Sequence, residues 1–297
     1  MDGSPGGRIK AWVLAARPKT LVASVVPVAV GAGLAFRDTG SFPAFLFILA
    51  LLFCLLVQIG TNFSNDYYDY GRGADHDRSL GPARAVASGM IAPRAMFVVS
   101  LCVLALAFGV GVVLMEISEA DRSLLWIGIA SVLFAIAYTG GPLPLAYNGL
   151  GDLFVILFFG LVAVGTTHYV LVAGVGQDWR PNWVVPLGIG FAVNNLLVVN
   201  NTRDCREDGK VGKNTLVVLL GRRSGLVLYG LGLAVSTLLC PSLDPDVSLV
   251  VWVFPLGLFC LFKLSKASTR QQYGFALLAT SLGILAYGFL AVLSLVA

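Results

Sequence analysis

The sequence predicts an all-α integral membrane protein, with nine transmembrane helices around a central cavity and the N-terminus in the cytoplasm. Composition is the first support for this prediction. Of the 297 residues, 57% are hydrophobic and only 12% are charged, and the mean hydropathy is +0.85. A soluble globule could not hide so much apolar surface. Long apolar runs and a one-sided distribution of basic residues add to this support.

The expected elements follow in order along the chain. Residues 1–8 are rich in glycine and are expected to be disordered, and residues 9–16 are expected to form a short interfacial helix. Nine apolar runs follow, each long enough to cross a hydrocarbon core of about 30 Å as a helix. They cover residues 20–36, 43–63, 95–115, 123–139, 151–173, 183–201, 224–242, 247–263 and 272–296. The whole chain, 1–297, is therefore interpreted as one multi-pass domain.

The basic residues give an independent test of this topology, because Lys and Arg are retained on the cytoplasmic side of short loops. With the N-terminus inside, the cytoplasmic segments contain all 20 basic residues except Arg37, Arg122 and Arg180. In a bacterium this membrane would be the plasma membrane. The basic residues are divided among separate loops without a continuous stripe, so we expect no nucleic-acid partner.

Two acidic segments lie at the ends of predicted spans, both on the predicted cytoplasmic side: residues 65–77 and residues 200–208. Clustered carboxylates beside hydrocarbon repel one another and lose hydration, so they favour a bound cation. Four spans separate the two segments, which suggests an internal duplication that places them face to face across a cavity. The alternative is a solvated acidic loop neutralised by neighbouring arginines.

Helical spacing predicts that each segment presents a stripe of oxygen ligands. Residues three or four apart share a helix face, which groups Asn62, Asp66 and Asp69 in one segment and Asn200, Asp204 and Asp208 in the other. Magnesium prefers such hard oxygen ligands together with the phosphate oxygens of a substrate. Two facing stripes suit two Mg²⁺ ions that bridge one diphosphate. The expected metal ligands are Asn65, Asp66, Asp69, Asp75, Asp204 and Asp208, of which Asp69, Asp75, Asp204 and Asp208 are the expected catalytic residues.

Basic residues close to both segments can bind the phosphate oxygens. The candidates are Arg72, Arg84, Lys210 and Lys213, although positive-inside bias explains any one of them alone. Further candidates for lining the cavity are Arg17, Lys19, Tyr138, His168, Tyr169 and Asn201. Helix packing is the competing explanation for Tyr138, His168 and Tyr169, and helix-end anchoring for Arg17 and Lys19.

With these motifs the chain resembles the UbiA-type intramembrane prenyltransferases. Asn65, Asp69 and Asp75 match the first aspartate motif of that family, and Asp204 and Asp208 match the second. Arg84 matches the arginine of an R-x-x-x-S-G stretch, and Lys213 matches a basic residue after the second motif. Five residues separate Asp69 from Asp75, where many members have three. The resemblance covers nearly all nine spans.

Local phrases such as Asn65-Asp66-Tyr67-Tyr68-Asp69 and Gly151-Asp152 are similar to the branch that acts on 1,4-dihydroxy-2-naphthoate, in menaquinone or phylloquinone biosynthesis. The resemblance implies magnesium-dependent transfer of a prenyl chain from a polyprenyl diphosphate to that aromatic acid, with decarboxylation. It also implies an active site facing the cytoplasm.

Three alternatives remain open from the sequence. One is another branch of the family, with 4-hydroxybenzoate, homogentisate or haem as acceptor. A second is a CDP-alcohol phosphotransferase, although its D-G-x-x-A-R signature is absent. The third is a cation-coupled transporter, whose carboxylates usually lie near the membrane midplane.

Overall fold

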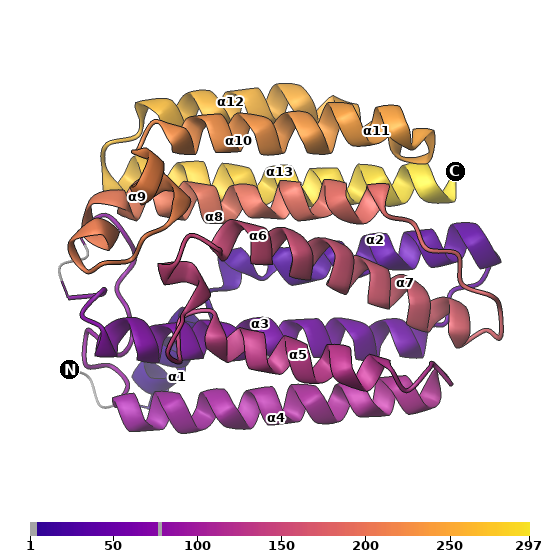
Figure 1. Cartoon of the computed structure of the whole chain (residues 1–297), viewed down its shortest axis with the longest axis horizontal. Coiled ribbons are helices and arrows are strands. Elements are labelled where there is room, and N and C mark those ends of the chain that lie inside the picture. The colour runs from indigo at the N-terminus through magenta and orange to yellow at the C-terminus, as the bar shows by residue number, and fades with distance from the viewer. Residues whose placement is uncertain (1–4, 77–78) are drawn as a thin grey trace.

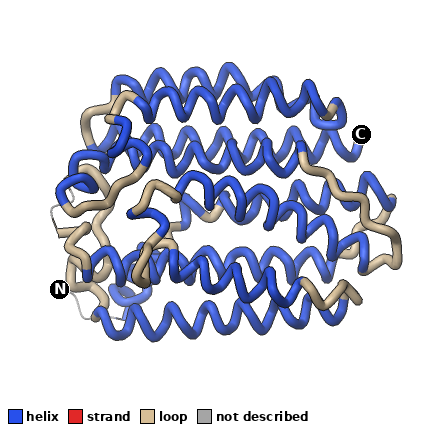
Figure 2. Tube along the Cα trace, in the orientation of Figure 1, coloured by secondary structure: helices blue, strands red, loops and turns tan. Residues whose placement is uncertain are grey.

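The computed structural model describes residues 5–76 and 79–297, and this part of the chain contains helices and no strands (Figures 1 and 2). Asp77 and Arg78, which belong to the predicted acidic segment and its loop, lie outside the described residues, as do residues 1–4. The predicted all-α class is confirmed. Helix α1 (Pro5–Ala16) begins four residues before the expected interfacial helix, so residues 5–8 are helical where disorder was expected.

Long helices run side by side along the length of the molecule (Figure 1). Eight helical segments among the described residues are long and apolar enough to cross a membrane. They are α2 (Val22–Thr39), α3 (Ala44–Gly71), α4 (Pro93–Ile117), α6 to α7 (Gly151–Ala173), α8 (Val184–Lys210), α10 to α11 (Ser224–Leu243), η5 to α12 (Pro245–Lys266) and α13 (Arg270–Val296). Each matches one predicted span.

The remaining predicted span, 123–139, forms helix α5 (Leu124–Ala137) with 14 residues. At 1.5 Å per residue it is about 21 Å long, which is shorter than a typical hydrocarbon core. The chain therefore has the nine predicted helical segments, but only eight of those described reach spanning length. Large apolar side chains such as Trp126 and Trp252 are more than 70% exposed on the outer surface, as expected for a surface that faces lipid.

The fifth segment is interrupted by a π-helical turn. It consists of α6 (Gly151–Val155), η3 (Ile156–Val162) and α7 (Ala163–Ala173), and η3 packs closely against α8. Two glycines make this close approach possible: a Cβ at Gly160 would lie 2.5 Å from the Pro186 carbonyl oxygen, and one at Gly190 would lie 2.5 Å from the Ile156 carbonyl oxygen. Small residues at helix crossings commonly permit such packing in membranes.

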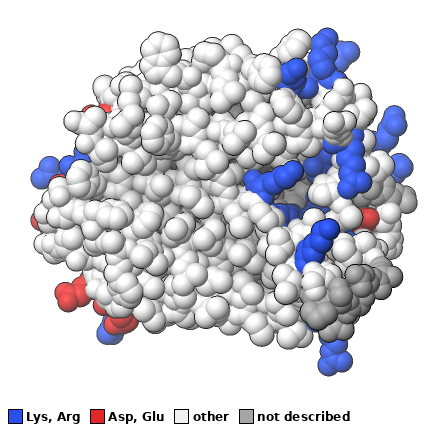
Figure 3. All heavy atoms as spheres, turned by 180° about the vertical axis from the view of Figure 1, so that it is seen from behind, with Lys and Arg blue, Asp and Glu red and all other residues white. Residues whose placement is uncertain are grey.

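Shorter elements complete the chain: η1 (Pro18–Thr20), η2 (Leu145–Tyr147), α9 (Leu216–Leu220), α10 (Ser224–Ala234), η4 (Val235–Leu239), α11 (Cys240–Leu243), η5 (Pro245–Val253) and α12 (Phe254–Lys266). The ends of α3 and α8, together with α9, lie at one end of the bundle (Figure 1). The back view shows most of its lysines and arginines at that same end (Figure 3). The fold therefore gathers the acidic segments and the basic loops in one place.

Candidate active site

A single large cavity joins the acidic segments to the apolar interior of the bundle. Its volume is about 570 Å³, within the usual range for a ligand pocket. Charged and amide side chains line one end, and aromatic and aliphatic side chains line the rest. The apolar part includes Phe53, Val57, Phe134, Phe154, Val155, Phe158, Phe159 and Leu197. A ligand that fits this cavity has a charged head and a long hydrocarbon tail.

Helix α3 forms a polar wall of the cavity. Thr61, Asn62, Asn65 and Asp69 all line it, at the spacing of one helix face. The Thr139 hydroxyl donates a 2.8 Å hydrogen bond to Asn65 Oδ1, and Asn62 Nδ2 donates to the Ala16 carbonyl. These bonds fix the orientation of both amides. Of the predicted stripe, Asn62 and Asp69 line the cavity, whereas Asp66 does not and instead accepts a hydrogen bond from the loop after the helix.

The two acidic segments end in the same backbone geometry. In each, a glycine four residues after the aspartate has positive φ, 76° at Gly73 and 71° at Gly212. The next residue then returns its N–H to the aspartate carbonyl: Ala74 to Asp69 and Lys213 to Asp208, both at 2.9 Å. This is the 6→1 hydrogen bond of a Schellman helix end, which favours glycine because it needs a left-handed residue. Both acidic segments therefore end their helices in the same way.

The side chain of Lys213 links the two segments. Its Nζ lies 3.7 Å from Asp69 Oδ2 and 3.7 Å from Asp208 Oδ1, so one cationic group faces a carboxylate from each segment. Tyr147 completes the arrangement, because its hydroxyl donates a 2.9 Å hydrogen bond to Asp69 Oδ1. Burial and the charge of Asp69 raise the pKa of Tyr147, which keeps the phenol protonated as a donor. The predicted meeting of the two segments is thus observed.

The loop after α3 folds back over the first segment. Arg84 Nε lies 3.3 Å from Asp75 Oδ1, which joins a predicted metal ligand to a predicted diphosphate ligand. Next to it, the Ala85 backbone N–H donates to Asp66 Oδ2 at 3.1 Å. The other carboxylate oxygen of Asp66, Oδ1, is buried and has no hydrogen-bond partner among the described residues. A buried carboxylate oxygen of this kind is suited to a cation.

The second segment carries its own base. Both carboxylate oxygens of Asp204 accept hydrogen bonds from the Arg203 guanidinium, each at 2.7 Å, in the bidentate geometry typical of Arg–carboxylate pairs. Both residues line the cavity, as do Asn200, Asn201 and Asp208. The predicted stripe of Asn200, Asp204 and Asp208 on α8 is therefore present.

Arg17 reaches the cavity mouth from a strained backbone position. Its φ of 55° and ψ of 63° are left-handed, a conformation that costs a non-glycine residue roughly 1 to 2 kcal/mol. This break between α1 and η1 lets both Arg17 and Lys19 line the cavity. Tyr138 lines the cavity from the C-terminal end of α5. Non-glycine residues in strained conformations are concentrated at functional sites.

Six of the sequence candidates are not among the cavity-lining residues: Asp66, Asp75, Arg72, Lys210, His168 and Tyr169. Lys210 is exposed on the last turn of α8, and Arg72 donates to the Gly141 carbonyl, with its guanidinium 5.0 Å from the Tyr147 ring centre. His168 and Tyr169 are placed by packing at the other end of the bundle, which is the alternative that the sequence had left open.

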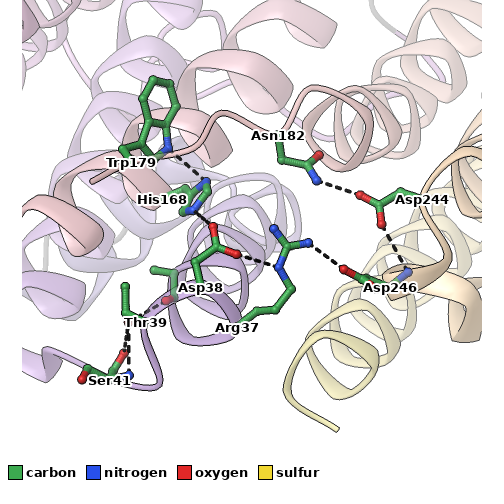
Figure 4. A network of polar contacts seen from close by, with 10 residues as sticks. Arg37, Asp38, Thr39, Ser41, His168, Trp179, Asn182, Asp244 and Asp246 are labelled. Atoms are coloured by element: carbon green, nitrogen blue, oxygen red, sulfur yellow. Dashed lines mark hydrogen bonds and ion pairs between the residues drawn. The ribbon is translucent and has the colours of Figure 1, made fainter. Parts of the chain in front are cut away.

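Figure 4 shows His168 between Asp38 and Trp179: its Nε2 lies 2.8 Å from Asp38 Oδ2, and the indole N–H of Trp179 donates to its Nδ1. The Tyr169 hydroxyl accepts from the Asp121 N–H. These contacts connect the helices with loops at that end of the bundle, so neither candidate lines the cavity and packing explains both.

The sequence interpretation gave no role to two polar residues of the site. Asp152 at the start of α6, quoted only within a family phrase, is buried and lines the cavity, and it accepts a 3.0 Å hydrogen bond from Asn194 Nδ2 of α8. Tyr147 lies outside the lining and acts on it through its hydrogen bond to Asp69. A carboxylate at the beginning of an apolar run is a signal that could have identified Asp152.

The donors of this site match magnesium in type. Among the described residues, no three carboxylate, histidine or cysteine side chains converge as a ready-made metal cluster. The site instead offers carboxylate and amide oxygens, the ligands that Mg²⁺ takes one or two at a time beside substrate phosphate. The buried Oδ1 of Asp66 and the position of the Lys213 ammonium between two carboxylates mark places where positive charge is favoured.

The fold and the cavity define a helical membrane protein with a charged head-group site above an apolar tunnel. The UbiA prenyltransferase family model matches residues 24–276, so the chain belongs to this family, and the resemblance inferred from the sequence is confirmed. Among its relatives, "1,4-dihydroxy-2-naphthoate octaprenyltransferase" of Haemophilus influenzae is 33% identical over 86% of this chain and 84% of its own length.

The protein with the same name from Mycobacterium tuberculosis is 37% identical over 77% of this chain and 76% of its own length. A solved structure agrees with the fold. The UbiA homolog from Archaeoglobus fulgidus bound to GPP and Mg²⁺ has a TM-score of 0.59 and 16% identity, over 95% of this chain and 99% of that one.

Proposed function

We propose that this protein transfers a polyprenyl chain from its diphosphate to 1,4-dihydroxy-2-naphthoate and releases diphosphate and carbon dioxide. The observation that carries the proposal is the cavity itself. Lys213 joins the two acidic segments at one end, and the other end is a tunnel of aromatic and aliphatic side chains. The named activity of relatives at 33% and 37% identity supports the choice of acceptor.

Two Mg²⁺ ions are proposed to be held by Asn65, Asp66, Asp69, Asp75, Asp204 and Asp208. When bound, they neutralise the charge that develops on the leaving diphosphate. Arg84 and Lys213 then bind its phosphate oxygens, because both bases line the cavity beside these carboxylates. Lys210 and Arg72 lie outside the cavity lining. They are proposed to act only through the positive electrostatic potential that they contribute at the mouth of the cavity.

The aromatic acid is proposed to enter beside Arg17 and Lys19, which orient its carboxylate. Both residues line the cavity near the first acidic segment. Tyr138 and Asn201 line the same cavity and are proposed to contact the ring or the allyl group. The bond between the prenyl carbon and oxygen breaks, a carbon–carbon bond to the ring forms, and the ring carboxylate leaves as carbon dioxide. We propose that this site faces the cytoplasm, as the distribution of basic residues predicts.

One incubation tests reaction and acceptor together. Membranes with the expressed protein receive Mg²⁺, an allylic diphosphate and a panel of aromatic acids, and products are identified by mass. We expect a decarboxylated prenyl adduct of 1,4-dihydroxy-2-naphthoate, and none with EDTA. Transfer to 4-hydroxybenzoate or homogentisate alone would overturn the acceptor.

Asp69→Asn and Asp208→Asn should abolish the product. Asp178→Asn, a substitution of an exposed carboxylate that does not line the cavity, is the matched control and should leave it unchanged. Full activity in either of the first two variants would contradict the metal assignment.

A further inference from the structure

A second, smaller hollow continues the apolar tunnel. Its volume is about 70 Å³, and it lies between α3, α4, α5 and α7. The hollow and the main cavity share the lining residues Phe53, Cys54, Ser131, Val162 and Thr166. Phe53 is 16 residues before Asp69 on α3, which places it about 24 Å from the charged end at 1.5 Å per residue. The hollow is therefore the far end of the tunnel.

The chemistry of this hollow is that of a hydrocarbon site. Beyond the shared residues its lining includes Ala50, Phe108, Gly111, Leu114, Met115, Gly128 and Val170. The hydroxyls of Ser131 and Thr166 donate to carbonyls of their own helices, at 2.7 and 2.5 Å, so they present few free polar groups. No charged side chain lines it. An apolar chain entering the hollow would break no hydrogen bond of the protein.

We infer that this hollow receives the last units of the prenyl tail and sets the longest chain that the enzyme accepts; this inference depends on the proposed function. The occupant follows from continuity, because a tail whose diphosphate lies at Asp69 must pass Phe53 to go further along α3. Two glycines keep the hollow open. A Cβ at Gly111 would lie 3.0 Å from the Phe53 ring, and a Cβ at Gly128 would lie 3.8 Å from the Phe108 ring.

Gly128→Leu is designed to fill the hollow, since Gly128 lines it and a Cβ there is at ordinary contact distance from its neighbours. Gly111→Ala is the second variant, because it forces the Phe53 ring to move. Gly109→Leu is the matched control on α4: nothing lies within 4 Å of its Cβ, and the residue is exposed. All three proteins are assayed in membranes with all-trans allylic diphosphates from geranyl to octaprenyl.

For Gly128→Leu we expect unchanged kcat/KM with the shortest diphosphate and at least about a tenfold loss with the longest, equivalent to about 1.4 kcal/mol. Gly111→Ala should shift the length preference in the same direction, and Gly109→Leu should not. If the native protein transfers chains and Gly128→Leu keeps its length preference, a lipid acyl chain or no ligand fills the hollow and the inference is wrong. If the native protein transfers no chain of any length, the proposed function fails first.

Discussion

Replacing Lys213 by methionine tests the centre of the site. The substitution keeps much of the side-chain volume and removes the charge that faces Asp69 and Asp208. Both carboxylate oxygens lie 3.7 Å from the same nitrogen, so they are at most about 7.4 Å apart, and their repulsion is at least about 2 kcal/mol at an effective dielectric constant of 20. Lys213, Asp69 and Asp208 side chains are at most 15% exposed, so solvent screens this repulsion little.

The expected loss in free energy of unfolding is about 3 kcal/mol, the lower end of the cost of removing one partner from a buried ion pair. Magnesium should restore most of it in the variant. An ion present at about 100 times its dissociation constant stabilises the folded state by about 2.7 kcal/mol. The native protein should gain less, because the ion must first displace the Lys213 ammonium from the two carboxylates.

The assay is unfolding of the detergent-solubilised protein, measured with EDTA and then across a magnesium titration. Lys210→Met is the matched control, because Lys210 is three residues away, exposed and outside the cavity lining. It should behave as the native protein at every magnesium concentration. Two outcomes would refute the electrostatic reasoning. One is a Lys213→Met variant that is as stable as the native protein in EDTA, and the other is a variant that magnesium stabilises no more than it stabilises the native protein.

Three further outcomes follow from single contacts. Tyr147→Phe removes the hydrogen bond to Asp69. The magnesium concentration needed for half-maximal activity should rise roughly ten- to a hundredfold, equivalent to about 1.5 to 3 kcal/mol. Because the pKa of Tyr147 is raised, its phenol does not ionise below pH 10, and the pH profile should keep its shape in the variant. His168→Phe breaks two partly buried hydrogen bonds far from the cavity and should lower the unfolding midpoint while KM for both substrates is unchanged. Gly160→Ala forces a Cβ to 2.5 Å from a backbone oxygen and should strongly reduce folded yield, whereas Gly165→Ala, with nothing within 4 Å, should not; equal yields would contradict the close helix packing.

Much of the fold was predictable because lipid leaves few alternatives to apolar helices of spanning length. Within the described residues, each of the nine predicted runs corresponds to a helical segment, and eight of these segments reach spanning length. The exception is α5, where the predicted span of 123–139 is a helix of 14 residues. The predicted span was extended as far as the apolar residues continue. The backbone, however, leaves the helix after Tyr138 and turns through Gly141, which has a φ of 75°.

Site residues were predictable where the spacing of nearby residues determines their position. They were less predictable where contacts between distant helices determine it. Asp69 and Asp208 were identified because helical spacing and clustered charge act within a few residues. His168 could not be assigned because a polar residue inside an apolar run can either line a cavity or pack between helices, and its contacts with Asp38 and Trp179 are what decide for packing. Asp152 was missed because its partner, Asn194, is 42 residues away and belongs to another helix.

Four carboxylates of this site are paired with bases, and this pairing helps to explain how such a charged cavity can exist in a membrane protein. Asp75 faces Arg84, Asp204 is held by Arg203, and Lys213 lies between Asp69 and Asp208. When a cation and a diphosphate enter together, the cation can take the carboxylates while the anion takes the bases, so each buried charge keeps a partner of opposite sign. Either one alone would leave buried charges uncompensated. The same residues thus stabilise the folded cavity and favour a substrate that brings both charges.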